Sequence, residues 1–102
     1  MNMKREYIIS QRTKSLAEKY NLLVYPSENL KYKLEVYKSS GKFIGYIGLN
    51  ETIDYSFLLK LVQKNIISKS IAETQKSNWI YKYQNLINSI KSIKYEYLLL
   101  WQ

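Results

Sequence analysis

Hydrophobic periodicity changes near residue 50 of this chain, and that change constrains the fold more than any other feature. From residue 22 up to residue 47, apolar and polar residues alternate, most clearly in 32–38, with the period of a half-buried strand. After residue 52, apolar residues recur at helical spacing. We therefore predict an α+β fold, with a small antiparallel sheet of about three strands and two or three helices packed on one face.

Turn residues divide the two halves into elements. We expect strands over 22–25, 32–38 and 43–47, separated by a Pro-Ser turn at 26–29 and a glycine hairpin at 39–41. We expect helices over 4–20, 51–67 and 70–90, and residues 95–101 are too short to classify. Asn50 or Thr52 is expected to cap the second helix, and Ser70 with Glu73 reads as a capping box for the third.

The chain has 102 residues, of which 46% are hydrophobic, so residues 1–102 are predicted to form a single domain with a modest core. The residues expected at its centre are Leu34, Val36, Ile44, Ile47, Leu58, Leu59, Val62, Trp79 and Tyr83. Residues 1–20 are either a basic helical arm that docks on a partner or a helix packed against the sheet. Apolar runs are too short for a membrane span or a signal peptide, so we expect an intracellular protein without membrane contact.

The residues that carry most enzyme chemistry are missing. The chain has no cysteine and no histidine, which removes disulfides, thiolate metal sites and the usual general base. Glu51 and Asp54 are the carboxylates that could form an acid/base pair, but charges that complement a helix N-terminus are the favoured explanation of both residues. We therefore predict a protein that is not an enzyme, with no catalytic residues, no metal and no cofactor.

Sixteen Lys and Arg residues against eight Asp and Glu give a net charge of +8. A field of this sign attracts nucleic acid or an acidic protein surface, although a solvated basic surface explains it as well. The aromatic and basic run 81–83 resembles a single-strand binding surface, but its place inside a helical pattern favours a helix with one core side and one exposed side. The candidate contact residues are Arg5, Arg12, Lys14, Lys19, Lys31, Lys33, Lys42, Tyr81, Lys82 and Trp101.

The ordered motifs resemble a family of small proteins of large nucleocytoplasmic DNA viruses. The motifs are Pro26-Ser27, Lys33-Leu34-Glu35-Val36-Tyr37, Gly41-Lys42, Ile47-Gly48, Asp54-Tyr55 and Leu99-Leu100-Trp101. Where that family tends to carry Arg-His in its basic helix, this chain has Tyr83-Gln84-Asn85. The resemblance implies a viral structural protein, a minor capsid or core-associated component of the virion, located in the virion or host cytoplasm.

A rival pattern resembles the small-subunit ribosomal protein sixteen family. It rests on the hairpin 32–48, on Ile53-Asp54 and on the small-residue break near Ser68. This resemblance implies a protein of an organelle matrix, encoded by an AT-rich genome, with Lys31, Lys33 and Lys42 on rRNA phosphates. The virion interpretation instead places aromatic surfaces, including Trp101, against other proteins. We expect protein–protein assembly as the primary role and non-specific phosphate contact with nucleic acid as a secondary one.

Overall fold

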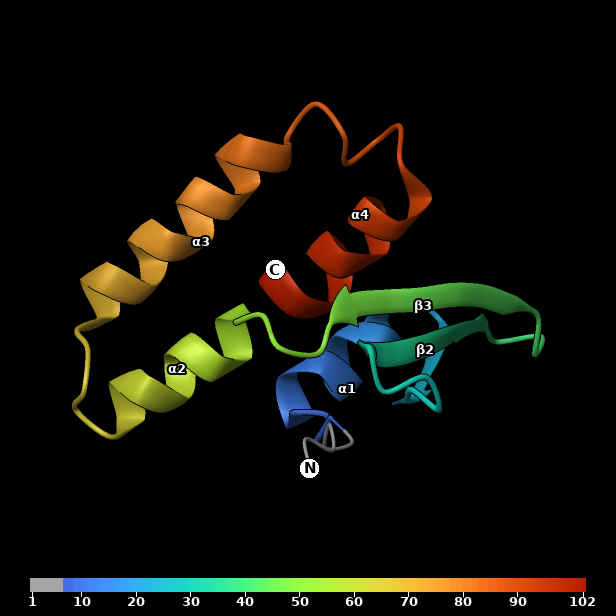
Figure 1. The fold of residues 1–102 in the computed structure, drawn as a ribbon, viewed down its shortest axis with the longest axis horizontal. Helices are drawn as coiled ribbons and strands as arrows, with labels where there is room; N and C mark the ends of the chain where they lie inside the picture. Colours follow the sequence, from blue (N-terminus) through green and yellow to red (C-terminus); the bar gives the residue numbers. More distant parts are fainter. Residues whose placement is uncertain (1–6) are drawn as a thin grey trace. The chain divides into compact units, whose positions relative to one another are not determined.

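The computed structural model describes residues 7–102 and confirms the α+β class (Figure 1). Helix makes up 46% of the chain and strand 20%. The chain divides into two compact units, Met1–Thr52 and Ile53–Gln102. The single domain expected over 1–102 stays a prediction, and each unit is described by itself below.

The first unit joins one helix to the whole sheet. Its elements are α1 (Gln11–Lys19), β1 (Leu22–Pro26), β2 (Tyr32–Lys38) and β3 (Phe43–Leu49). The sheet is antiparallel with the strand order β1-β2-β3, which confirms the three predicted strands. The first helix is shorter than the predicted 4–20, because the Ser10 side chain accepts the Thr13 N–H at 3.1 Å and so caps α1. Residues 7–9 are not helical, and 4–6 lie outside the described residues.

The hairpin between β2 and β3 has the predicted glycine turn. Gly41 has φ +95°, a conformation that side chains disfavour, and its N–H donates to the Lys38 carbonyl at 2.8 Å. The Lys38 N–H in turn donates to the Lys42 carbonyl at 2.8 Å. A register shift between Val36 and Tyr37 adds a bulge just before this turn.

The core of the first unit uses the predicted side of β2. Leu34 and Val36 are fully buried, and Ile47 of β3 is 1% exposed. The helix α1 packs on β1 and buries Thr13 and Ala17. The alternation in 32–38 therefore placed Leu34 and Val36 in the core correctly, but the strand is not half-buried as expected, because Lys33 and Glu35 on its other side are also buried.

The second unit is entirely helical. It contains α2 (Tyr55–Gln63), α3 (Lys69–Tyr83), α4 (Lys91–Glu96) and a π-helical turn, η1 (Tyr97–Trp101). The third predicted helix ends at Tyr83 rather than at residue 90, and the unclassified segment 95–101 continues α4 into η1. With α1, residues 7–102 therefore hold four α-helices, one more than the largest number predicted.

The cap of α2 differs from the prediction. The Asp54 carboxylate accepts the Phe57 N–H at 2.9 Å, so the helix begins at Tyr55. The Asn50 side chain donates to the Leu30 carbonyl at 3.0 Å, and the Thr52 hydroxyl donates to the Leu49 carbonyl at 2.7 Å. Both side chains therefore serve the end of the first unit instead of capping α2.

Two tryptophans organise the second unit. Trp101 is 4% exposed and stacks on Trp79, with ring centroids 5.3 Å apart and an angle of 11° between the rings. Trp79 also contacts Tyr83, one helical turn later, at 4.7 Å. Of the predicted core of this unit, Leu58 is buried. Four others are half-buried: Leu59, Val62, Trp79 and Tyr83.

The cap of α3 provides a matched test of local structure. Ser68, not Ser70, accepts the Ile71 N–H at 3.2 Å, so the predicted capping box is wrong. We expect Ser68→Ala to lower the free energy of unfolding by about 1 kcal/mol, the usual value of a serine N-cap. Ser70→Ala removes an equivalent hydroxyl two residues later and is the control, with an expected change below about 0.5 kcal/mol. Urea unfolding followed by circular dichroism measures both, and equal effects would contradict the observed cap.

Candidate functional site

Five aromatic rings form a continuous row on the sheet. Tyr25 of β1 meets Tyr37 of β2 at 5.7 Å between ring centroids, and Tyr37 meets Phe43 of β3 at 5.2 Å. Phe43 then meets Tyr46 at 5.2 Å, and Tyr46 stacks on Tyr32 at 5.6 Å. Tyr25, Phe43 and Tyr46 are 49%, 45% and 40% exposed, and the other two rings are half-buried. We call these five residues the aromatic row.

The sheet register explains how four of these rings meet; the fifth, Tyr32, is placed by strand alternation on the side of Leu34 and reaches Tyr46 from the first residue of β2. Tyr37 is the Cα partner of Phe43, and Glu35 is the partner of both Tyr25 and Tyr46. In a strand, residues two apart share a side, so Tyr37 lies on the side opposite the buried Leu34 and Val36. The sequence placed Tyr37 on this side, but the pairing that brings rings from three strands together was not predicted.

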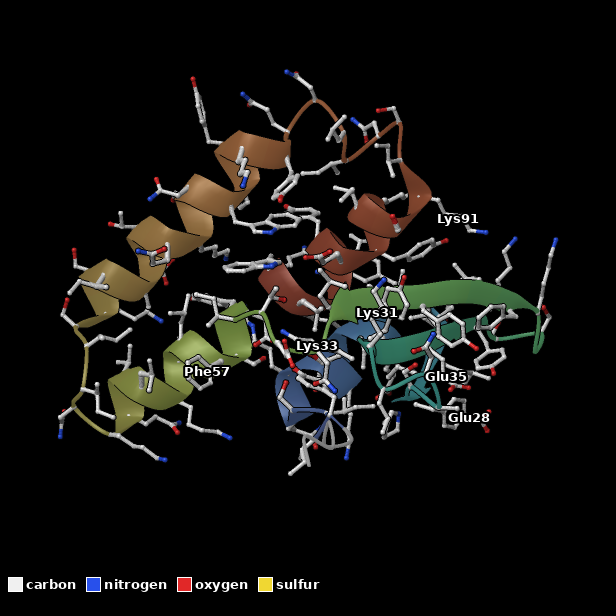
Figure 2. All side chains as sticks on the ribbon, in the orientation of Figure 1. Glu28, Lys31, Lys33, Glu35, Phe57 and Lys91 are labelled. Carbon is white, nitrogen blue, oxygen red and sulfur yellow. The ribbon has the colours of Figure 1, made fainter. Side chains whose placement is uncertain are left out.

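A carboxylate holds the centre of the row in place. The Tyr37 hydroxyl donates to Glu35 Oε2 at 2.7 Å, and the Glu28 N–H donates to Glu35 Oε1 at 2.7 Å. Figure 2 labels the two glutamates, which lie close together. The pKa of Tyr37 is raised to about 12, mainly by the hydrogen bond to Glu35 and then by burial and nearby negative charge. The orientation of the Tyr37 ring is therefore fixed by the strand that carries it.

This hydrogen bond gives a titration test. We expect Glu35→Gln to move the pKa of Tyr37 from about 12 toward the model-compound value of 10.0, because the charged acceptor is lost. Since the folded-state pKa is the higher one, the hydrogen bond stabilises the fold below pH 10 and loses its effect as the pH rises toward 12. NMR titration of the tyrosine ring carbons measures the shift. Glu73→Gln, in the other unit, should leave Tyr37 unchanged.

Exposed lysines lie beside the aromatic row at two turns of the chain, the turn before β2 and the turn between β2 and β3. Lys31 is exposed, with its Nζ 5.8 Å from the centroid of the Tyr32 ring. Lys38 and Lys42 are exposed at the two ends of the β2–β3 turn, next in sequence to Tyr37 and Phe43. Lys33 does not join them, because it is only 2% exposed and its Nζ lies 5.3 Å from the centroid of the Tyr7 ring. The expected phosphate contact by Lys33 is therefore wrong.

The cations of the predicted basic arm do not form one stripe. Residues seven apart on an α-helix point the same way, whereas residues two apart point about 200° apart. Arg12 and Lys19 therefore share a side of α1, and Lys14 lies on the other side. Lys19 Nζ lies 5.4 Å from the centroid of the Tyr20 ring. Arg5 lies outside the described residues.

The remaining candidates are in the second unit and are not gathered into one site. Tyr81 is 76% exposed and Lys82 is exposed, with its Nζ 5.3 Å from the centroid of the half-buried Tyr83 ring. Trp101 is buried against Trp79, so its ring is a core group and the expected partner contact is corrected.

Ionisable groups also meet around Tyr55 in the second unit. The Tyr55 hydroxyl donates to Glu73, which forms an ion pair with Lys69 at 3.4 Å. The pKa of Tyr55 is raised, mainly by burial and then by this hydrogen bond. The same hydrogen bond is the main cause of the lowered pKa of Glu73. Lys76 Nζ lies 4.6 Å from the Tyr55 ring centroid. Tyr55 is 3% exposed, so these contacts fasten α2 to α3.

Comparison with protein families, curated proteins and solved structures gives no match for this chain. Among residues 7–102, no three acidic side chains come close enough together to hold a metal ion. None of the helices in the same range has the length and apolar character needed to traverse a bilayer. The aromatic row is therefore the feature on which a function can be argued.

Proposed function

We propose that this chain is a non-enzymatic binding protein that contacts single-stranded nucleic acid through the aromatic row. The carrying observation is the continuity of five rings across three strands, three of them at least 40% exposed. Bases stack on such rings whatever their sequence, since every base has a π face. A flat sheet that presents aromatic rings is also a common platform for splayed-out bases of RNA.

The neighbouring charges favour a polyanion over an apolar protein surface. Lys31, Lys38 and Lys42 border the row, and the chain carries a net charge of +8. Phosphates that follow the stacked bases would meet these ammonium groups. Lysine acts as a point charge rather than a bidentate base reader, so we propose binding with little sequence preference. Duplexes keep their bases stacked inside, so single strands should bind more tightly.

The broader expectations from the sequence belong to the same proposal. A virion or core-associated protein that packs a viral genome needs contact of this kind, as does a ribosomal protein on rRNA. The role as an assembly partner of larger proteins and the location in a virion, host cytoplasm or organelle matrix stay predictions. Genome context discriminates the two origins, with a neighbouring capsid gene favouring the first and a ribosomal operon the second.

The salt dependence of oligonucleotide binding tests the proposed contacts between these lysines and phosphates. Each phosphate neutralised on a single strand contributes about −0.7 to the log–log slope, so three lysines should contribute about −2. We expect replacement of Lys31, Lys38 and Lys42 by glutamine to flatten the slope for a fluorescent oligouridylate by about that amount. Glutamine at Lys60, Lys64 and Lys91, which are exposed in the second unit, removes equal charge and is the control.

Fluorescence anisotropy over a range of salt concentrations gives both slopes. The proposal loses its support if the two triple variants flatten the slope equally, because the field of the whole chain would then explain the attraction. It fails if the wild-type protein does not bind oligouridylate at low salt, or if it prefers duplex.

A further inference from the structure

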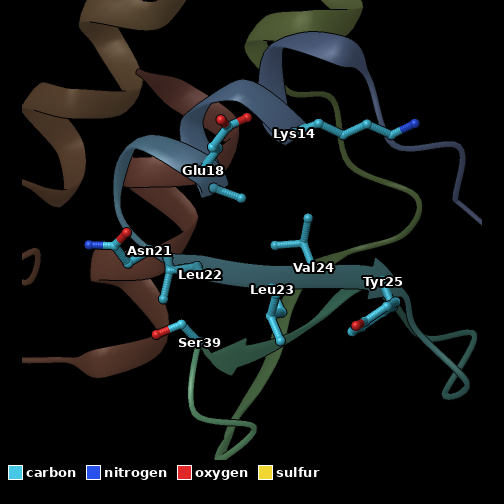
Figure 3. Close-up of a pocket in the computed structure, with 9 residues that line it drawn as sticks. Lys14, Glu18, Asn21, Leu22, Leu23, Val24, Tyr25 and Ser39 are labelled. Atoms are coloured by element: carbon cyan, nitrogen blue, oxygen red, sulfur yellow. The ribbon is translucent and has the colours of Figure 1, made fainter.

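The first strand of the sheet has an open edge beside a groove. A hollow of about 460 Å³ runs between α1 and β1, lined by Lys14, Ala17 and Glu18 of the helix and by residues 22–25 of the strand (Figure 3). The strand order β1-β2-β3 leaves one side of β1 without a neighbouring strand in the part of the chain that is described. Unpaired N–H and C=O groups of an edge strand are a template for a further strand.

The composition of β1 does not protect this edge. Natural edge strands are usually blocked by charges, proline, bulges or a covering element. The segment 22–25 reads Leu-Leu-Val-Tyr, with no charge, and its regular pairing with β2 has no bulge. Leu23 and Tyr25 are 39% and 49% exposed. Pro26 ends the strand and leaves the preceding four residues available for pairing.

The charges on α1 indicate which strand fits. The helix ends at Lys19 and the chain turns back into β1 at Leu22, so Glu18 lies toward Leu22 and Lys14 toward Tyr25 (Figure 3). A two-fold axis perpendicular to the sheet, between Leu23 and Val24, would pair β1 with a second β1 in antiparallel fashion. The same rotation would bring Lys14 of each copy toward Glu18 of the other. The groove is therefore self-complementary in both hydrogen bonding and charge.

The geometry points to a second copy of this chain as the occupant of the edge. The two copies join β1 to β1 into one six-stranded antiparallel sheet, with the two α1 helices on the same side. The rotation keeps the Tyr25, Tyr37, Phe43 and Tyr46 rings of both copies on one side of that sheet, because its axis is perpendicular to it. The dimer itself does not depend on nucleic-acid binding and is tested without it.

Charge reversal at the two helix positions tests the dimer. Both side chains are exposed, so Lys14→Glu and Glu18→Lys should leave the fold intact, as circular dichroism can verify. In a dimer of either single variant, positions 14 and 18 carry the same charge and face each other at two equivalent contacts. We therefore expect the Kd of the dimer to rise about tenfold. The two variants mixed together, and the double variant, restore opposite charges and should recover the wild-type Kd. Lys42→Glu has the same charge change on β3 and is the control.

Sedimentation equilibrium gives the mass and the Kd of each sample. We expect wild-type protein to reach twice the 12.2 kDa of one chain, and we expect Leu23→Lys, which adds a charge to the edge, to reduce dimerisation. A wild-type chain that stays monomeric up to millimolar concentration would overturn the inference. A dimer that neither Leu23→Lys nor the reversals weaken uses another surface, which would also overturn it.

Discussion

Replacing Trp101 with alanine is expected to cost about 3–5 kcal/mol of stability in the second unit, the range for a fully buried aromatic side chain. The indole is 4% exposed and stacks on Trp79 at 5.3 Å. Its neighbours Leu99 and Leu100 are 1% and 2% exposed, so η1 supplies three consecutive buried residues. Truncation leaves a cavity that a short π-helical turn cannot fill.

Tyr81→Ala is the matched control, since this ring is 76% exposed on α3 of the same unit. Surface substitutions of this kind change stability by about 0.5 kcal/mol or less. Urea unfolding followed by NMR signals of α2 and α3 reports on the second unit alone, so the result does not depend on how the first unit unfolds. A loss below about 1 kcal/mol for Trp101→Ala would show that the stacked pair is not the core of this unit.

The sequence predicted the sheet well because strand periodicity is local. Alternation in 32–38 correctly placed Leu34 and Val36 in the core, but it did not predict that Lys33 and Glu35 on the other side are buried as well. Helix boundaries were less predictable, because a cap depends on which of several adjacent polar residues reaches the free N–H groups. Ser68 and Ser70 are equally good candidates by composition, and the backbone at Ser68 decides between them.

The candidate site was harder to predict for a physical reason. Tyr25, Tyr37 and Phe43 come from three strands, and only the pairing register makes them neighbours. Charge was a misleading guide at Lys33, which is buried, and at α1, whose cations point to different sides. The high tyrosine content was visible in the sequence. The signal that could have located the site is that each predicted strand carries at least one tyrosine, at positions 25, 32, 37 and 46.

Removing two rings of the aromatic row should abolish most single-strand binding. Phe43 and Tyr46 are exposed and adjacent on β3, with centroids 5.2 Å apart. Each stacked base contributes about 1–3 kcal/mol by alanine substitution, so the double variant Phe43→Ala, Tyr46→Ala should weaken oligouridylate binding about a hundredfold. Fluorescence anisotropy at fixed low salt measures this loss.

Phe57→Ala with Tyr81→Ala is the control, because it removes two exposed rings, 46% and 76% accessible, from the second unit. Both double variants keep the net charge of +8, so any difference between them reports stacking and not attraction of phosphate. The salt slope of the Phe43 and Tyr46 variant should stay that of the wild type, since all three bordering lysines remain. If its affinity instead equals that of the control, the rings do not stack on bases, and the charge alone attracts nucleic acid.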